Sequence, residues 1–182
     1  MSELILKKQS IKTKTIGAVL AVACAVALPQ IFHFLGAVSG LGTSLGEAFL
    51  PMHIPVLLAG FLFGPIVGFA VGALSPVISF LISGMPTAAV MPFMIIELAS
   101  YGVVAGFFKN SRVSTVLGVL TAQVAGRAVR AAAVLIAFYG IRYTAIPVAS
   151  IWKSAVTGLF GIALQLVLIP LILYRIKGKK NV

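Results

Sequence analysis

The sequence predicts an all-α integral membrane protein, a bundle of six transmembrane helices with both termini in the cytoplasm. Hydrophobic residues make up 60% of the 182-residue chain, charged residues only 9%, and the mean hydropathy is +1.15. A soluble domain would carry about 25% charged residues. A transmembrane helix uses roughly 20 residues, so this length accommodates about six helices and no separate soluble domain. We therefore expect residues 1–182 to form one membrane domain.

The first three predicted helices are bounded by glycine and proline. An apolar run over residues 16–35 gives the first helix, and the Gly and Ser residues over 36–46 indicate a loop. The second helix, residues 54–63, stops at Gly64-Pro65. It is short for a span, but neighbouring helices can cover the ends of such a segment at membrane depth. The third helix is expected over residues 67–82.

The last three helices are separated by turns and polar residues. A turn over residues 83–86 leads into a fourth helix over 90–108, which ends at the polar run 109–112. The fifth helix is predicted over residues 113–139 and the sixth over 151–174.

Basic residues set the expected orientation. Most of the 14 Lys and Arg residues lie in the N-terminal segment 1–14, the connection 109–112 and the tail 175–182. Six spans place these segments on one side of the membrane, and Lys and Arg are enriched in cytoplasmic loops. The net charge of +11 therefore indicates an orientation in a lipid membrane and not nucleic-acid binding. The first apolar stretch resembles a signal peptide, but the rest is equally apolar, so we expect a retained helix.

Three charged residues, Glu97, Arg127 and Arg130, are expected at membrane depth. Such residues are costly in lipid and usually face the bundle interior or a water-filled cavity. Gln123, Arg127 and Arg130 stand at i, i+4 and i+7, so they share one face of the fifth helix. Glu97 and Arg130 fall about 10 Å and about 13 Å from the outer ends of their helices, which allows them to pair. The pair either fixes helix packing or contacts a ligand, and these roles are compatible.

Aromatic residues and histidines near the outer ends of the helices are further candidates. The ring of His53 can line a site or anchor a loop. Tyr139, Tyr143 and Trp152 suit membrane-interface anchors, with a ligand lid as the alternative. His33 is the second of the two histidines, and few carboxylates accompany them, so a metal site has little support.

Two further patterns bear on function. Gly17, Ala21 and Ala25 recur every four residues on the first helix and form a smooth face, which suits close packing inside the bundle or against a partner. The sequence has no GxxxxGK[ST] phosphate loop and no HExxH pair. We therefore expect a transport protein without its own ATPase motif and not an enzyme.

The stretch from Leu50 to Pro86, LPMHIPVLLAGFLFGPIVGFAVGALSPVISFLISGMP, resembles the substrate-binding S components of energy-coupling factor (ECF) transporters. Six helices and basic ends add to this likeness, as does MPFMIIELASYG from Met91 to Gly102. The resemblance implies the vitamin-binding subunit of an ABC-type importer. Such a subunit docks onto a transmembrane coupling subunit and two cytoplasmic ATPases. It implies no cofactor in this chain, because the partners use the ATP.

The resemblance also implies where ligand and partner bind. The ligand is expected near the outer face, under the loop over residues 36–50 and among the last three helices. The implied substrate-binding residues of this chain are His53, Met85, Glu97, Tyr101, Arg130, Trp152 and Lys153. The face of Gly17, Ala21 and Ala25 is implied to contact the coupling subunit.

The MHIPVLLAG segment resembles the branch of S components linked with cobalamin or pantothenate. Cobalamin is the leading substrate hypothesis, with pantothenate or another small vitamin as the alternative. Related nickel and cobalt S components begin with a Met-His pair, whereas Met52 and His53 are internal, so no metal substrate is expected. A stand-alone carrier or channel is the second hypothesis. An intramembrane enzyme or an assembly factor is a remote third.

Overall fold

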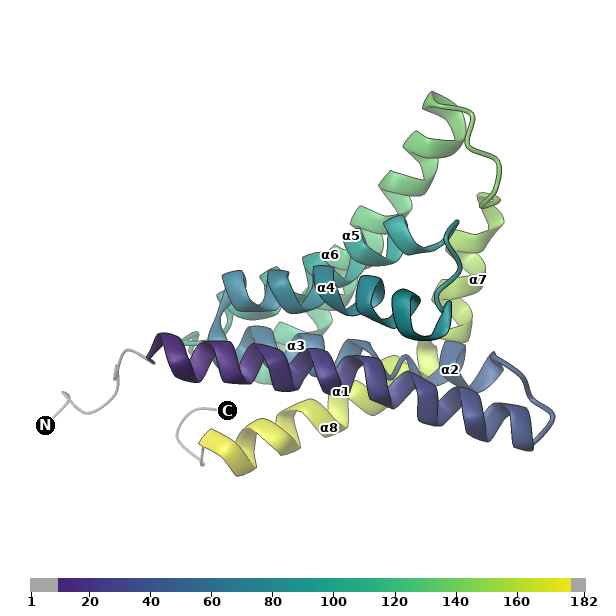
Figure 1. The fold of residues 1–182 in the computed structure, drawn as a ribbon. Helices are drawn as coiled ribbons and strands as arrows, with labels where there is room; N and C mark the ends of the chain where they lie inside the picture. The colour runs from purple at the N-terminus through teal and green to yellow at the C-terminus, as the bar shows by residue number, and fades with distance from the viewer. Residues whose placement is uncertain (1–9, 178–182) are drawn as a thin grey trace, which may run out of the picture.

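The computed structural model describes residues 10–177, which fold into helices without any strand (Figure 1). The helices are α1 (Ile11–Val38), α2 (Ser44–Phe49), α3 (His53–Phe63), α4 (Pro65–Ser83), α5 (Met91–Phe107), α6 (Thr115–Leu135), the π-helical turn η1 (Ile136–Gly140), α7 (Ala149–Thr157) and α8 (Leu159–Lys177). The basic residues expected at the extreme ends, Lys7, Lys8, Lys179 and Lys180, lie outside the described residues.

Within residues 10–177, five helical segments are long and apolar enough to cross a membrane, which confirms a multi-pass membrane protein. They are Ile11–Val38, Ser44–Phe63, Pro65–Ser83, Thr115–Gly140 and Leu159–Ile176. The apolar helix α5 has 17 residues and a length of about 26 Å, close to the roughly 30 Å of a bilayer core. A sixth span therefore depends on α5, and the count of six stays a prediction.

Gly64-Pro65 ends the second predicted helix in the structure as it does in the sequence. Gly64 has φ +99°, a conformation that side-chain-bearing residues rarely adopt. Its N–H still donates to the Gly60 carbonyl, while Pro65 begins α4 at the first helical position, where its missing N–H is not needed. The two helices can therefore change direction without an intervening loop.

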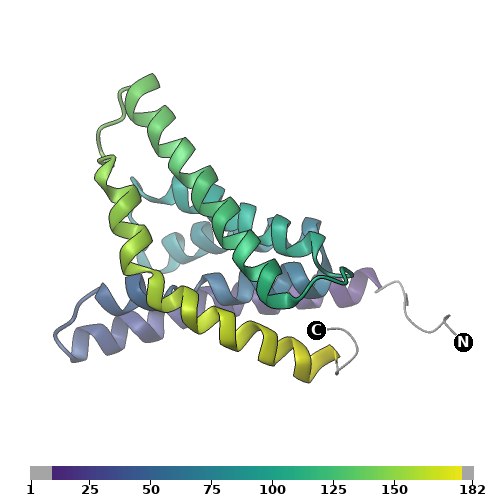
Figure 2. The same cartoon turned by 180° about the vertical axis from the view of Figure 1, so that it is seen from behind.

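The sixth predicted helix is wrong as one continuous helix, because Gly158 separates α7 from α8 (Figure 2). Glycine is a weak helix former. The Ser154 carbonyl, near the end of α7, accepts the Gly158 N–H and also accepts from Nη1 of Arg127 at 2.9 Å. A Cβ at position 158 would overlap Nη2 of Arg127. The loop predicted over residues 36–46 is also too long, since α2 begins at Ser44.

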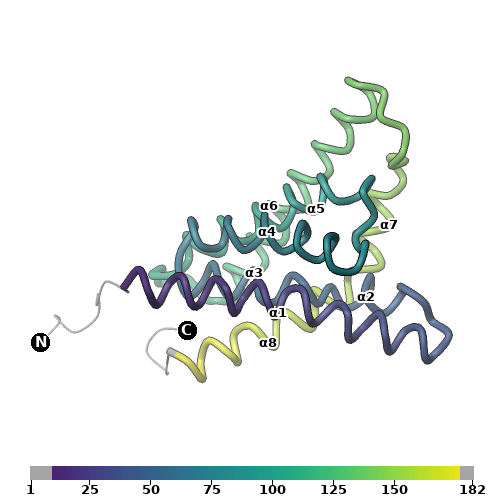
Figure 3. Tube along the Cα trace, viewed as in Figure 1, coloured from purple at the N-terminus to yellow at the C-terminus, as the bar shows by residue number. Residues whose placement is uncertain are grey.

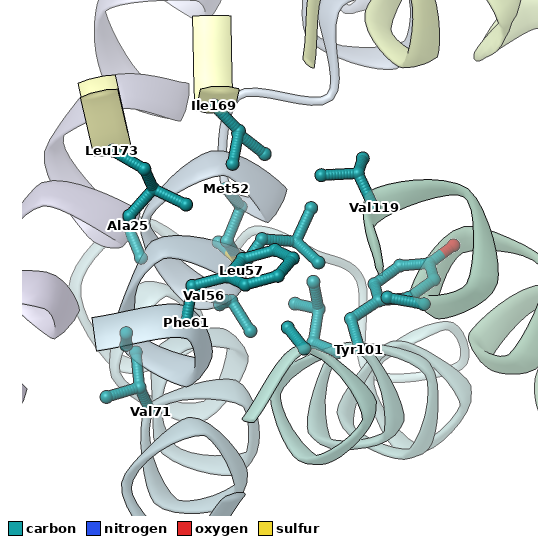
Figure 4. Packing of buried hydrophobic residues seen from close by; sticks show 14 residues of the cluster. Ala25, Met52, Val56, Leu57, Phe61, Val71, Tyr101, Val119, Ile169 and Leu173 are labelled. Atoms are coloured by element: carbon teal, nitrogen blue, oxygen red, sulfur yellow. The ribbon is translucent and has the colours of Figure 1, made fainter. Parts of the chain in front are cut away.

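The bundle is built around α3, which packs against α1, α4, α5 and α8. Val56, Leu57 and Phe61 of α3 lie at the centre of the buried cluster, with Ile169 of α8 on one side and Tyr101 of α5 on the other (Figure 4). The end of α6 and α7 lean away from this core (Figure 3). The space between the core and this arm is where the candidate site lies.

Helices α4 and α5 approach each other along a row of glycines. A Cβ on Gly68 would overlap the carbonyl oxygen of Gly102, and a Cβ on Gly102 would overlap that of Gly68. One turn along, Gly72 faces the backbone of Leu98 in the same way. Small residues permit this separation of helix backbones.

The small-residue face of α1 packs inside the bundle. Gly17 lies against the ring of Phe63, and Ala25 is fully buried in the core cluster. Ala21 is half-buried and also packs against that cluster. In this chain the pattern therefore serves internal packing, and partner contact by these residues stays a prediction.

The described basic segments gather at one end of the bundle. The start of α1, the α5–α6 connection and the end of α8 all lie there (Figure 1). Lys109 follows α5, and burial lowers the pKa of its ammonium group below the ordinary value. The nearby charge of Lys14 on α1 lowers that pKa further. This clustering is what the predicted orientation requires, and the side of the membrane stays a prediction.

Candidate functional site

A cavity of about 600 Å³ lies at the end of the bundle where α2 and α7 are found. Ligand pockets usually measure roughly 300–1,000 Å³, so the cavity has the size of a small-molecule site. Its walls come from the second half of α1, α2, the start of α3, the end of α4, the loop over residues 84–90, α5, α6 and α7. The cavity thus joins segments from nearly the whole chain.

Glu97 and Arg130 form an ion pair in the wall of the cavity, which confirms the predicted pairing. Nη1 of Arg130 lies 3.0 Å from Oε2 of Glu97. The hydroxyl of Tyr101 donates to the other carboxylate oxygen, Oε1, at 2.8 Å. Glu97 is only 2% exposed, so both oxygens of a buried carboxylate have partners. The network joins α5 to α6 and neutralises one of the two arginines at this depth.

His53 is the first residue of α3 and presents its ring to the cavity. It is 4% exposed, and its ring packs against that of Tyr101 with 5.1 Å between centroids. Neither ring nitrogen has a hydrogen-bond partner of good geometry in the described part of the chain. Buried polar groups are nearly always hydrogen-bonded, and a neutral imidazole offers one donor and one acceptor. The ring therefore has unused capacity for a bound molecule.

Arg127 lies one helical turn before Arg130 on α6 and also lines the cavity. Its Nη1 donates to the Ser154 carbonyl, whereas its buried Nε has no hydrogen-bond partner among the residues that the structure describes. Among residues 10–177 no carboxylate pairs with this guanidinium. Ser150 on α7 adds a buried hydroxyl that is also without a partner.

Helix α7 turns a polar face to the cavity. Ser150, Lys153, Ser154 and Thr157 line it and stand at i, i+3, i+4 and i+7, which places them on one side of the helix. Trp152 lies on the other side and is 76% exposed. An exposed indole at the end of a bundle suits a membrane interface.

The remaining wall is largely apolar. Thioethers and proline rings are prominent among its apolar residues, which are Pro29, Leu50, Pro51, Met52, Met85, Pro86, Val90 and Met94. The wall is completed by Gly46 and the polar residues His33, Thr43, Glu47, Ser79 and Thr87. Methionine is flexible and polarizable, so three thioethers can adapt to the shape of a bound molecule. The combination of polar and apolar groups in the lining fits an amphipathic ligand.

Five of the seven predicted substrate-binding residues line the cavity. They are His53, Met85, Glu97, Arg130 and Lys153. Tyr101 does not line the cavity but contacts Glu97 and His53, which do, whereas Trp152 is outside the cavity. The structure thus brings together most of the set, and contact with substrate stays a prediction for each residue.

Several lining residues were missed in the predicted set, although some carried a sequence signal. Val90 and Met94 precede Glu97 by seven and three residues, so they share its face of α5. Ser150 and Ser154 share a helix face with the predicted Lys153. Arg127 was recognised as a charge at membrane depth but not assigned to the site. Helical spacing alone would have added these positions.

The fold and the cavity together define a multi-pass membrane protein with a site for a small molecule. Residues 12–173 match the family model described as the ECF transporter, substrate-specific component, and the chain belongs to this family. Its members are substrate-binding transport subunits and not enzymes in themselves. No curated protein and no solved structure matches this chain.

Proposed function

We propose that this S component captures a vitamin or vitamin precursor outside the cell, in the cavity between α3, α5, α6 and α7. The supporting observation is a cavity of about 600 Å³ whose lining has buried polar atoms without a hydrogen-bond partner in the described chain, on His33, His53, Arg127 and Ser150. Helices α2 and α7, which line the cavity, lie at the end of the bundle opposite the basic segments (Figure 1). If those segments are cytoplasmic by the positive-inside rule, the cavity faces outward.

The substrate hypotheses differ in size. Cobalamin was the leading one, and its corrin ring with a nucleotide loop is several times bulkier than pantothenate. A cavity of about 600 Å³ is ordinary for a drug-sized ligand. This volume supports pantothenate or another small vitamin ahead of cobalamin.

ATP-driven uptake separates an S component from a stand-alone carrier. The small molecule that co-purifies with the full chain is first identified by mass spectrometry. The chain is then placed in vesicles, either alone or together with a coupling subunit and two ATPases. We expect that molecule to be bound by the chain alone and accumulated only with the module and ATP. Accumulation by the chain alone would support a carrier and contradict the proposal. Vesicles holding the module without this chain are the control.

The docking surface on α1 can be located with two tryptophan variants. Ala21 packs against the core, whereas Ala23 is exposed on the outward side of the helix. We expect Ala23→Trp to prevent co-purification with the coupling subunit while ligand binding is retained. Ala21→Trp should instead destabilise the isolated chain by about 1–3 kcal/mol through overpacking. If Ala21→Trp prevented co-purification with an unchanged Tm, the face of Gly17, Ala21 and Ala25 would be the docking surface.

A further inference from the structure

The charges around the cavity do not balance. Its lining holds three cationic side chains, Arg127, Arg130 and Lys153, and two carboxylates, Glu97 and Glu47. Glu97 uses both oxygens on Arg130 and Tyr101, and Glu47 is an exposed rim residue that accepts from Thr43. Within the described chain, neither carboxylate is placed to neutralise Arg127.

The position of Arg127 is fixed although its charge is uncompensated. The Ser154 carbonyl holds Nη1 at 2.9 Å, and the absence of a side chain at Gly158 leaves room for Nη2. The buried Nε has no acceptor. A partly buried guanidinium without an anion is unfavourable, because such charges are normally paired. An anion supplied by a ligand would remove this penalty.

His53 adds a second recognition group beside Arg127. The charges of Arg127, Arg130 and Glu97 all lie close enough to act on its ring. Neither ring nitrogen has a hydrogen-bond partner of good geometry within residues 10–177, so the ring can donate one hydrogen bond and accept another. That pattern fits a hydroxyl or amide group in the ligand, near the anionic group that Arg127 would bind.

We infer that the substrate carries a carboxylate, which binds the guanidinium of Arg127 beside His53. Its less polar body then contacts the thioethers of Met52, Met85 and Met94. This inference rests on the proposed function and narrows it to an acidic, vitamin-sized molecule. A cationic ligand would instead meet Arg127 and Lys153, and among the described lining residues only the exposed rim residue Glu47 offers a carboxylate that is not paired with an arginine.

Acid and neutral forms of the same molecule test the inference directly. The paired probes are pantothenate with pantothenol, biotin with biotin amide, and nicotinate with nicotinamide, and cobalamin is tested in addition. Each compound is titrated into the purified full chain in a calorimeter. We expect one acid to bind, with its neutral counterpart at least about tenfold weaker, because hydrogen bonds to charged groups are the stronger ones. Equal binding within each pair, tight binding of cobalamin, or binding of no acid would overturn the inference.

Arg127→Gln assigns the effect to one side chain. In this variant the Kd of the bound acid should rise about 10- to 100-fold, towards that of the neutral form. Arg112→Gln removes the same charge from the exposed α5–α6 connection and should change neither Kd. Arg127→Lys should restore part of the preference. Loss of packing would weaken the binding of the acid and of its neutral form alike. An unchanged preference for the acid over its neutral form in Arg127→Gln would therefore overturn the assignment to Arg127.

The uptake assay keeps this inference separate from the proposed function. ATP-dependent import of a neutral compound through the coupling module would overturn the carboxylate inference and leave the S-component function standing. Failure to import any compound would count against the function itself.

Discussion

Replacing Glu97 with Ala should lower the free energy of unfolding by about 3–5 kcal/mol, the usual effect of breaking a buried ion pair from one side. The change leaves the Arg130 guanidinium without its partner, next to the equally uncompensated Arg127. It also leaves the Tyr101 hydroxyl without an acceptor in a fully buried position. Denaturant unfolding of the purified chain in detergent measures the loss.

Two exposed charges serve as controls for that result. Glu47→Ala removes the same group from the rim, and Lys153→Ala removes a cation whose head reaches water. Each should change the unfolding free energy by no more than about 0.5 kcal/mol. The loss in free energy of unfolding in the double variant Glu97→Ala/Arg130→Ala should be clearly smaller than the sum of the losses in the two single variants. Additive losses, or a Glu97→Ala effect as small as the controls, would show that the pair does not stabilise the bundle.

The pairing of Glu97 with Arg130 was predictable because it depends on helical spacing and equal depth, both of which the sequence contains. The contact between Arg127 and Ser154 was not. It requires the break at Gly158, and one glycine in an apolar run is a weak signal, since glycine is tolerated inside membrane helices. Once α7 is separate, its polar face turns Lys153 inward and Trp152 outward.

The small-residue face of α1 shows another limit of the sequence. Gly17, Ala21 and Ala25 suit close approach by any helix, whether it belongs to the same bundle or to a partner. The burial of Ala25 and the contact of Gly17 with Phe63 follow from how α3 lies against α1. That arrangement is a property of the packed bundle, which the spacing of small residues on one helix does not specify.

A methyl group at Gly102 should destabilise the protein by about 3 kcal/mol, the upper end of the range for overpacking. The Cβ of Gly102→Ala would overlap the Gly68 carbonyl, which belongs to a helix backbone and cannot rotate away as a side chain can. Helices α4 and α5 must therefore separate. Because α5 also carries Met94 and Glu97, ligand binding should weaken together with Tm.

Gly140→Ala is the matched control, because Gly140 is exposed and a Cβ there would meet the nearest atom of Ile136 at 3.8 Å. This change should stay within about 0.5 kcal/mol. Gly68→Ala forces the same two helices apart. The loss in free energy of unfolding in the double variant Gly68→Ala/Gly102→Ala should therefore be smaller than the sum of the losses in the two single variants. If the Gly102→Ala variant had the same Tm as the Gly140→Ala variant, the α4–α5 contact would be looser than the glycine row indicates. Position 102 would then not control the shape of the cavity.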